Sequence, residues 1–265
     1  MVDDASILHV EHTNEGVLRL TMDDQQSRNA LSEIMMKSLI EELTKVSSND
    51  AIRVVVIASN GPVFSAGHDL KEITEVRNQN DFGEEYFKKL FDTCSALMKL
   101  IVAYPKPVIA EVSGIATAAG CQLVASCDLA TSSDSAQFAT PGVNIGLFCS
   151  TPMVALSRNV SKKHAMEMLL TGDMVNAKKA KEIGLINNYF QTEELTKETM
   201  VLANKIASKS SAIVSVGKGA FYTQSELDLY AAYEYTSKVM VKNILQEDAK
   251  EGIDAFLEKR SPEWE

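Results

Sequence analysis

Two short stretches of small residues carry the chemistry that this sequence suggests most strongly. The first is FSAGHDL at residues 64–70, and the second is GIATAAGCQ at residues 114–122. Each follows an apolar run typical of a buried strand, at residues 52–58 and 107–112, and each leads into a helix-like segment. Small side chains let a ligand approach peptide N–H groups closely, and two such groups aimed at one carbonyl oxygen form an oxyanion hole. We therefore predict one anion-stabilising site built from both stretches.

Alternating strands and helices must position these stretches. Strands are expected at residues 7–13, 17–22, 52–58, 107–112 and 129–132. Helices are expected at residues 31–46, 82–103, 119–126, 161–170, 177–183, 195–208, 226–243 and 248–259, with one more beginning near Pro152. This alternation predicts an α/β domain with largely parallel strand pairing. Periodicity alone does not distinguish a doubly wound sheet from stacked ββα turns.

The composition narrows the classes of ligand. A chain of 265 residues can bury the core of one large domain, or of one domain with an appendage. Asp and Glu outnumber Lys and Arg by 36 to 26, and the resulting net charge of −10 disfavours nucleic acid as a partner. No apolar run reaches the roughly 18 residues of a membrane span, so no membrane insertion is expected.

The cysteines and the first residues suggest a reduced compartment. Four cysteines at positions 94, 121, 127 and 149 show no metal-ligand spacing, which fits free thiols better than a disulfide framework. The first fifteen residues contain no Lys or Arg, unlike a signal peptide or an Arg-rich transit peptide. We expect a cytoplasmic protein, or a mitochondrial matrix protein if the source is eukaryotic and a transit peptide is missing from this chain. Neither a metal nor a nicotinamide cofactor is implied, because no matching fingerprint is present.

Further motifs accompany the two loops in a fixed order. They are RNAL at residues 28–31, SCD at 126–128, FATP at 138–141, LTG at 170–172, AKEIGL at 180–185 and EGIDAFLEKR at 251–260. This ordered set, over almost the whole chain, resembles the crotonase superfamily, also called the enoyl-CoA hydratase/isomerase family. The resemblance implies a ClpP/crotonase-like spiral of ββα units in residues 1–194. It also implies a helical C-terminal region, residues 195–265, for trimerisation and coenzyme A contact.

The resemblance implies that the two loops hold the thioester carbonyl of an acyl-CoA and stabilise the enolate formed from it. One N–H is expected from Ala66, directly before Gly67, and the other from Ala119 in the small-residue triplet. Ala118 and Ala119 stand where many relatives have glycine, so a positive φ there would cost energy. No cofactor is implied beyond coenzyme A as part of the substrate.

The two proton-transfer positions depart from the family pattern. The family's hydratases use two glutamates, and the matching residues here are Gln122 and Gly142. Glutamine has no titratable proton near neutral pH, and glycine has no side chain. Loss of a general acid or base removes roughly 10²–10⁴-fold in rate per function. We therefore expect oxyanion stabilisation without hydration of a double bond.

Other polar residues near these motifs could substitute for the glutamates. His68 would titrate near neutrality, but its side chain could instead point away while its backbone lines the nucleotide pocket. Cys149 and Ser150 could line the acyl pocket, although no basic partner activates the cysteine and packing is the favoured role. Asn144 could orient a water or a carboxylate.

Two carboxylates are expected to be structural. Glu111 is a charge inside an apolar strand, where it needs a partner in the fold or an edge position. Asp128 follows the second loop's helix and is expected to support that loop by hydrogen bonding.

Coenzyme A needs positive charge and an adenine contact. Arg28, and Lys259 with Arg260, match places where relatives touch its phosphates or adenine, and Phe256 would pack near the adenine. The remaining residues that the resemblance assigns to this ligand are Ala30, Ala66, His68, Asp69 and Leu70. In the family the C-terminal group can come from a neighbouring subunit, so a homotrimer or a dimer of trimers is expected.

These observations predict an acyl-CoA-binding member of the family that acts in fatty-acid or related acyl-CoA metabolism. One alternative is decarboxylation of a malonyl-type thioester, or another enolate-forming reaction, with Gln122 and Asn144 orienting the leaving carboxylate. Another alternative is a non-catalytic acyl-CoA-binding or regulatory protein. Measurements of carbon dioxide release, hydration and binding separate the three.

Overall fold

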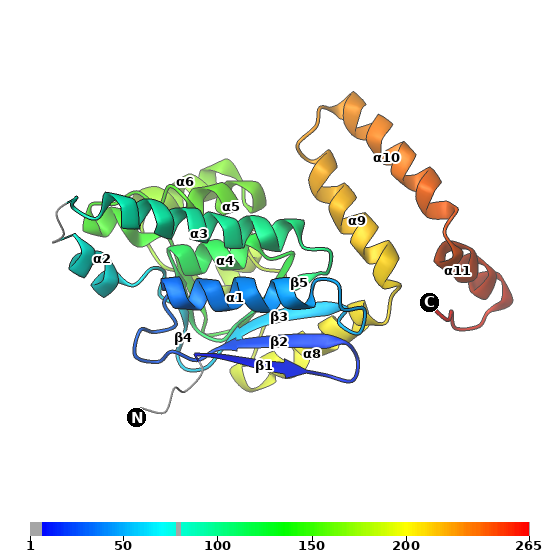
Figure 1. Cartoon of the computed structure of the whole chain (residues 1–265), viewed down its shortest axis with the longest axis horizontal. Helices are drawn as coiled ribbons and strands as arrows, with labels where there is room; N and C mark the ends of the chain where they lie inside the picture. The colour runs from blue at the N-terminus through cyan, green and yellow to red at the C-terminus, as the bar shows by residue number, and fades with distance from the viewer. Residues whose placement is uncertain (1–6, 78–80, 265) are drawn as a thin grey trace.

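Two sheets of unequal size carry the strands of this chain in the computed structural model, which describes residues 7–77 and 81–264 (Figure 1). In spatial order, the larger sheet contains β1 (Leu8–His12), β2 (Val17–Met22), β3 (Val54–Ser59), β5 (Val108–Val112), β7 (Leu129–Ser133) and β10 (Asn188–Phe190). The smaller contains β4 (Val63–Ser65), β6 (Ile115–Thr117), β8 (Gln137–Ala139) and β9 (Val175–Asn176). Pairing is antiparallel for β1 with β2 and for β8 with β9, and parallel for the other neighbours.

The chain passes repeatedly from the larger sheet to the smaller one. β3 is followed by β4, β5 by β6 and β7 by β8, and a helix or helical turn follows each pair. This repeated order is the predicted spiral of ββα units, which the structure confirms. Because β4, β6 and β8 are parallel neighbours, the loops that leave their carboxyl ends meet at one edge of the smaller sheet.

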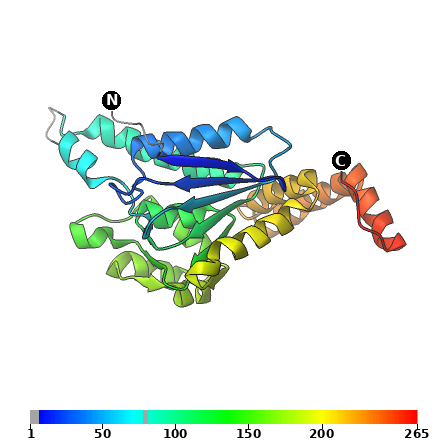
Figure 2. The same cartoon turned by 90° about the horizontal axis from the view of Figure 1, so that it is seen from below.

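Helices cover both faces of the larger sheet (Figure 2). The described helices are α1 (Glu33–Val46), α2 (Leu70–Val76), α3 (Glu84–Ala103), α4 (Ala119–Ser126), α5 (Pro152–Asn159), α6 (Lys162–Thr171), α7 (Ala177–Glu182), α8 (Leu195–Ala207), α9 (Ser211–Gln224), α10 (Leu229–Ile244) and α11 (Glu247–Glu258). Along β3, Val55 and Ile57 belong to the main core with α1, α3 and α4, while Val54 and Val56 pack against α8. Burial on both faces explains the uninterrupted apolar run of this strand.

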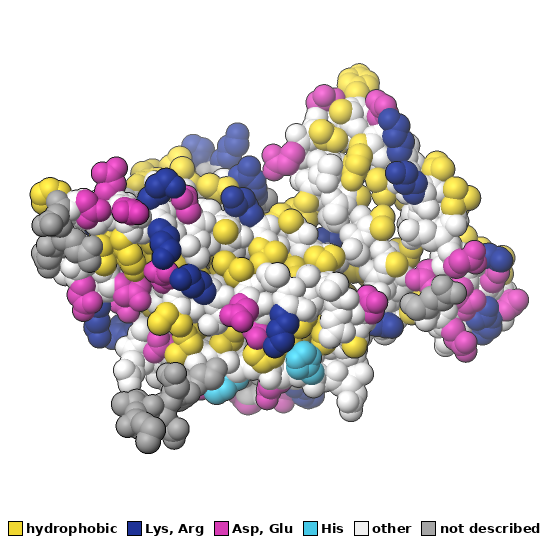
Figure 3. All heavy atoms as spheres, viewed as in Figure 1, with side chains coloured by type: hydrophobic (Ala, Val, Ile, Leu, Met, Phe, Trp, Pro, Cys, Tyr) yellow, Lys and Arg dark blue, Asp and Glu magenta, His cyan; other side chains and the backbone are white. Residues whose placement is uncertain are grey.

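The last three helices differ from the rest of the fold. α9 and α10 form a pair that stands away from the layered body, and α11 lies at the far end of the chain (Figure 1). Neither α9 nor α10 contains a fully buried residue. Large apolar side chains are exposed on these helices (Figure 3), including Phe221, Leu229, Tyr230, Tyr233, Met240, Val241, Ile253, Phe256 and Leu257. The predicted division after residue 194 stays a prediction, since α8 packs on the larger sheet and only the helices after it stand apart.

The predicted elements agree with the structure where a periodic pattern was strong. Ser32 caps α1 by accepting from the N–H of Met35, and α4 has the predicted bounds. α9 was not predicted, because Gly217 and Gly219 interrupt its pattern. The strands of the smaller sheet are two or three residues long, too short for periodicity to reveal them.

Candidate functional site

The two small-residue loops touch each other at the edge of the smaller sheet. The Thr117 hydroxyl donates to the carbonyl of Ala66 across a distance of 3.1 Å. Gly67 has a φ of +91°, and a Cβ added there would lie 2.9 Å from the Cβ of Ala118 and 3.3 Å from the nitrogen of Ala119. Glycine at position 67 is therefore required both by its backbone angle and by the approach of the second loop. The predicted convergence of the two loops is present in the fold.

The peptide N–H groups of these loops are not equally available. The Ala66 N–H donates to the carbonyl of Arg28 at 3.1 Å, so it is already engaged within the fold. This contact argues against the prediction that Ala66 donates to a ligand. In the described chain, the N–H groups of His68 and Ala119 have no acceptor. His68 directly follows Gly67, where an added Cβ would lie 3.3 Å from the Ala119 nitrogen, so these two free donors lie at the contact between the loops.

The second loop places its donor at the start of a helix. Ala119 is the first residue of α4, and Ala118 before it has φ +50° and ψ −117°. Of the two alanines for which a positive φ would cost energy, Ala118 adopts such an angle. Its N–H donates to the carbonyl of Ala139, which ties the loop to β8. The N-terminal end of α4 adds partial positive charge beside the Ala119 N–H.

His68 packs its ring inside the protein rather than into solvent. Its Nδ1 lies 3.1 Å from the carbonyl oxygen of Leu31, and its ring meets that of Phe91 edge-on, with 5.5 Å between centroids. Because a carbonyl only accepts, we assign the proton to Nδ1, and the buried Nε2 is left as an acceptor without a partner in the described chain. Burial lowers the pKa of His68, an effect that the hydrogen bond to Leu31 opposes. The ring is therefore neutral at pH 7.

Gln122 points into the interior beside a thiol. The residue is buried, and its Oε1 lies 3.8 Å from the sulfur of Cys94 on α3. Burial raises the pKa of Cys94 to about 12, so this thiol stays protonated at neutral pH. The pair can donate and accept hydrogen bonds, but it holds no group that exchanges a proton near pH 7. Cys94 was not anticipated as a partner, because it lies on a helix 28 residues earlier in the chain.

Gly142 is enclosed by the chain that follows it. It lies in a short helical turn, Pro141–Ile145, and its carbonyl accepts from the N–H of Leu147 at 2.9 Å. A Cβ at position 142 would lie 2.9 Å from both the Leu147 oxygen and the Cys149 sulfur. Burial raises the pKa of the Cys149 thiol, partly offset by a hydrogen bond from the Gly142 N–H. The thiol therefore occupies the space that a side chain at position 142 would need.

The other residues of this segment lie at the surface. Asn144 and Ser150 are both exposed, and the Ser150 hydroxyl donates to the carbonyl of Phe148 at 3.3 Å. Within residues 7–77 and 81–264, no hydrogen bond connects either side chain to Gln122. Their predicted roles in the acyl pocket stay predictions.

The N-terminal residues predicted to contact coenzyme A lie next to the loops. Arg28 is exposed, and Ala30 is buried with its N–H donating to Ser27. Asp69 caps α2 through the N–H of Lys71, and the Leu70 side chain is about half exposed. These positions surround the loops, but their ligand contacts stay predictions.

The C-terminal residues are far from the loops within one chain. Phe256 and Lys259 lie at the end of α11, on the opposite side of the molecule from α2 (Figures 1 and 2). Phe256 is 82% exposed. Arg260 is paired with Glu251 and Glu258. One chain therefore does not bring these residues to the site.

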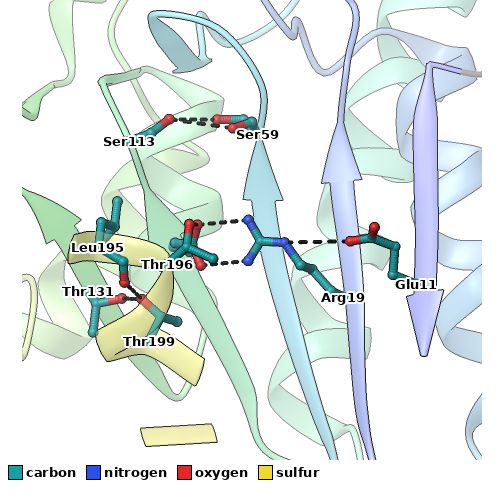
Figure 4. Close-up of polar contacts among 9 residues, drawn as sticks. Glu11, Arg19, Ser59, Ser113, Thr131, Leu195, Thr196 and Thr199 are labelled. Carbon is teal, nitrogen blue, oxygen red and sulfur yellow. Dashed lines mark hydrogen bonds and ion pairs between the residues drawn. The ribbon is translucent and has the colours of Figure 1, made fainter. Parts of the chain in front are cut away.

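The two carboxylates expected to be structural have partners in the fold. Arg19 donates to both oxygens of Glu111, at 2.6 and 2.8 Å, and Thr196 on α8 donates to it at 2.8 Å (Figure 4). This network lies on the face of the larger sheet that α8 covers. Asp128 accepts from Lys218 at 2.7 Å and Tyr222 at 2.9 Å, so it anchors α9. It also accepts from the N–H of Val108 at 2.7 Å, at the start of the strand that leads to the second loop, so it joins α9 to β5, and its direct support of the loop stays a prediction.

Comparison with known proteins gives matches over nearly the whole chain. The family model described as enoyl-CoA hydratase/isomerase matches residues 12–265. The human protein named enoyl-CoA hydratase domain-containing protein 3, mitochondrial, is 49% identical over 250 residues, covering 94% of this chain and 81% of that protein. The 2,3-dehydroadipyl-CoA hydratase of Escherichia coli (strain K12) is 32% identical over 249 residues, covering 94% of each.

Solved structures give the same picture. The crystal structure of human enoyl-CoA hydratase domain-containing protein 3 has a TM-score of 0.93 and 47% identity, covering 97% of this chain and 100% of that one. The crystal structure of an enoyl-CoA hydratase from Mycobacterium smegmatis has a TM-score of 0.92 and 47% identity, covering 97% of this chain and 98% of that one.

Among the helices that the structure describes, none has the length and apolar character of a membrane span. Over the same residues, no cluster of His, Cys, Asp and Glu is arranged to hold a metal ion.

Proposed function

This chain belongs to the enoyl-CoA hydratase/isomerase family, and from that premise we propose that it binds an acyl-CoA thioester between its two small-residue loops. The thioester oxygen accepts hydrogen bonds from the N–H groups of His68 and Ala119. The observation that carries this proposal is that these two donors, on loops in contact, have no acceptor in the described chain. An enolate oxygen would be held in the same place, because preorganised N–H groups act where negative charge develops.

The relatives support coenzyme A thioesters as the ligand class. Their names describe hydratases of enoyl-CoA and of 2,3-dehydroadipyl-CoA, which supports a role for this chain in fatty-acid or related acyl-CoA metabolism. Arg28, exposed beside the first loop, would supply positive charge to a phosphate of coenzyme A. The vertebrate relatives are named as mitochondrial proteins, which favours the mitochondrial matrix for a eukaryotic source.

A homotrimer, or a dimer of trimers, would complete the ligand site. Phe256 and Lys259 lie too far from the loops of their own chain to contact the same ligand, so they would serve a neighbouring copy. The exposed apolar side chains of α9, α10 and α11 support burial against such a copy. Light scattering at micromolar concentration should therefore give the mass of three or six chains. A stable monomer would remove the shared contact.

The proposed chemistry does not include hydration. Gln122 and Gly142 provide no carboxylate, and Cys149 occupies the space at position 142. Decarboxylation of a malonyl-type thioester is the second candidate, favoured by the neutral Gln122–Cys94 pair in place of a base. In that reaction the carboxylate leaves as carbon dioxide, its bonding electrons form the enolate, and solvent supplies the final proton. Only enolate stabilisation is then required of the protein.

A turnover screen tests these readings. Purified protein is offered crotonyl-CoA and a malonyl-type CoA thioester, and hydration, carbon dioxide release and binding are measured together. Release of carbon dioxide would select the decarboxylase, whereas tight binding without turnover would select a binding or regulatory protein. Hydration at rates typical of enzymes, on the order of 10 per second, would contradict the proposal. A failure to bind any acyl-CoA would reject the site itself.

A further inference from the structure

A buried asparagine with an unusual backbone lies behind the first loop. Asn29 is 1% exposed, and both it and Arg28 have positive φ angles, +52° and +57°. They lie in the turn that joins β2 to α1. Few residues with side chains adopt such angles, although asparagine is among those that tolerate them best. Neither the core packing nor the proposed ligand contacts use the Asn29 side chain.

The Asn29 amide is bonded to three separate backbone positions. Its Oδ1 accepts from the N–H of Asp24 at 2.7 Å. Its Nδ2 donates to the carbonyls of Asn60 at 2.9 Å and Val63 at 2.7 Å. The turn that contains Asn29 is thereby fixed to the first residue of β4, the strand that leads into the first loop. One buried side chain sets the distance between these two segments.

The same turn holds the two residues before the proposed donor and the ring of His68 itself. The carbonyl of Arg28 accepts from the N–H of Ala66 at 3.1 Å, and the N–H of Leu31 donates to the carbonyl of Gly67 at 2.7 Å. The ring of His68 is 3.1 Å from the carbonyl of Leu31. The His68 N–H therefore lies between groups that the turn holds in place, while remaining without an acceptor itself.

We infer that Asn29 is a positioning residue, which fixes the direction of the His68 N–H toward the thioester oxygen. The inference rests on the proposed function. Asn29 acts through the backbone carbonyls of Arg28 and Leu31 and does not touch the ligand. Without its amide the turn loses its bonds to Asn60 and Val63 and keeps only the backbone bonds to Ala66 and Gly67, so the direction of the His68 N–H is less well fixed. Polarisation of the carbonyl then weakens more than binding of the coenzyme A moiety does.

A chromophoric ligand reports that polarisation directly. The CoA thioester of p-dimethylaminocinnamic acid absorbs at longer wavelength when hydrogen bonds withdraw electrons toward its carbonyl oxygen. Asn29→Gly keeps the positive φ but removes the amide, and Asn29→Asp keeps the shape and an acceptor but loses both N–H donors. Binding to the wild type shifts the absorption maximum of this thioester to longer wavelength. At saturating protein concentration, we expect this shift to be less than half as large with each variant. Affinity for a nitronate analogue of the enolate should fall roughly 10-fold more than affinity for a plain acyl-CoA thioether.

A destabilised control separates positioning from general loss of stability. Glu111→Gln weakens the buried ion pair with Arg19, which lies on the face of the larger sheet that α8 covers. This variant should give the same shift of the absorption band as the wild type. Full displacement in folded Asn29 variants would overturn the inference and leave the proposed function standing. No displacement with the wild type would overturn the proposed function, and the inference with it.

A second variant applies if neither Asn29 variant accumulates as folded protein. His68→Phe keeps a ring against Phe91 and its own N–H, but removes the link to the Leu31 carbonyl. It should lose part of the displacement while it still binds the chromophore. An unchanged displacement in His68→Phe would contradict the part of the inference that has Asn29 act through the Leu31 carbonyl.

Discussion

The two sides of the candidate site are built in different ways. On the donor side, the loops that contain His68 and Ala119 present peptide N–H groups with no acceptor in the described chain. The other side, around Gln122 and Gly142, is the one where the family pattern places proton transfer. There the Gln122 amide oxygen contacts the Cys94 thiol, and the Cys149 thiol fills the space beside Gly142. One side presents backbone donors, whereas the other is filled by neutral side chains.

This difference shows which parts of such a site depend on individual side chains. The donors are backbone groups, so any sequence that keeps small residues at the contact between the loops retains them. Proton transfer needs a titratable group at a particular place, and a single substitution removes it. A chain can therefore keep the fold and the carbonyl-binding geometry while it loses the hydration chemistry of its relatives.

The largest expected effect comes from removing a donor. His68→Pro eliminates one N–H, and we expect affinity for a nitronate analogue of the enolate to fall about 10²- to 10³-fold, measured by calorimetry. His68→Ala is the matched control, because it loses the ring but keeps the N–H. If the two variants bind the analogue equally well, the His68 N–H is not a donor.

The next effect concerns the space at position 142. Gly142→Glu should destabilise the protein by about 1–3 kcal/mol, because its Cβ would lie 2.9 Å from the Leu147 oxygen and the Cys149 sulfur. Thermal and urea unfolding measure this change.

Removing the thiol should reverse part of that loss. Cys149→Ala combined with Gly142→Glu should be more stable than Gly142→Glu alone, because the new side chain gains room. Adding Gln122→Glu should then give a low rate of crotonyl-CoA hydration. The double variant Gln122→Glu with Gly142→Glu is compared with the triple variant that also carries Cys149→Ala. If both hydrate crotonyl-CoA at the same rate, the Cys149 thiol does not fill the space next to position 142.

The pH dependence of stability should distinguish the two sides. Burial lowers the pKa of His68 below its ordinary value of 6.5, so the unfolded chain takes up this proton first as the pH falls. Stability should therefore be complete above about pH 6.5 and decline below it toward the lowered pKa, by at most about 1.4 kcal/mol per pH unit from this group. Cys94, with a pKa raised to about 12, contributes nothing in that range. Urea unfolding between pH 5 and 8 should give a flatter profile for His68→Phe, and identical profiles would contradict the burial of a neutral ring.

The smallest effect tests the strain in the second loop. Ala118→Gly should raise the free energy of unfolding by about 1 kcal/mol, because its φ of +50° is unfavourable for alanine. Ala119→Gly, one residue later and inside α4, should lower it by roughly 0.5–1 kcal/mol. Chemical denaturation compares the two, and opposite signs are expected. A loss of stability in Ala118→Gly would show that the backbone there is not strained.

Much of the architecture could be predicted from the sequence because local patterns determine it. The buried strands before each loop, the Ser32 cap and the bounds of α4 all follow from short-range signals. The order of the motifs along the chain predicted the spiral of ββα units. The helix α9 was missed because its two glycines oppose a local helix prediction, whereas Lys218 and Tyr222 hold it to Asp128 through tertiary contacts.

The details of the site depend on contacts that sequence patterns do not show. Whether Ala66 or His68 offers its N–H is decided by the carbonyl of Arg28, which lies far away along the chain. Likewise, Cys149 fills the space beside Gly142 only because residues 147–149 fold back against it. The lack of a carboxylate at positions 122 and 142 could be read from the sequence, but the side chains that pack against these positions could not.

One measurement tests the central claim, that the carbonyl-binding side is intact and the proton-transfer side is lost. The wild type is mixed with the p-dimethylaminocinnamoyl thioester of coenzyme A, and the absorption spectrum is followed for an hour. We predict that the band moves to longer wavelength on binding and then persists, because the carbonyl is polarised while the double bond is not hydrated. A band that does not move would contradict carbonyl binding by the His68 and Ala119 donors, and a band that fades as the conjugation is lost would contradict the loss of proton transfer.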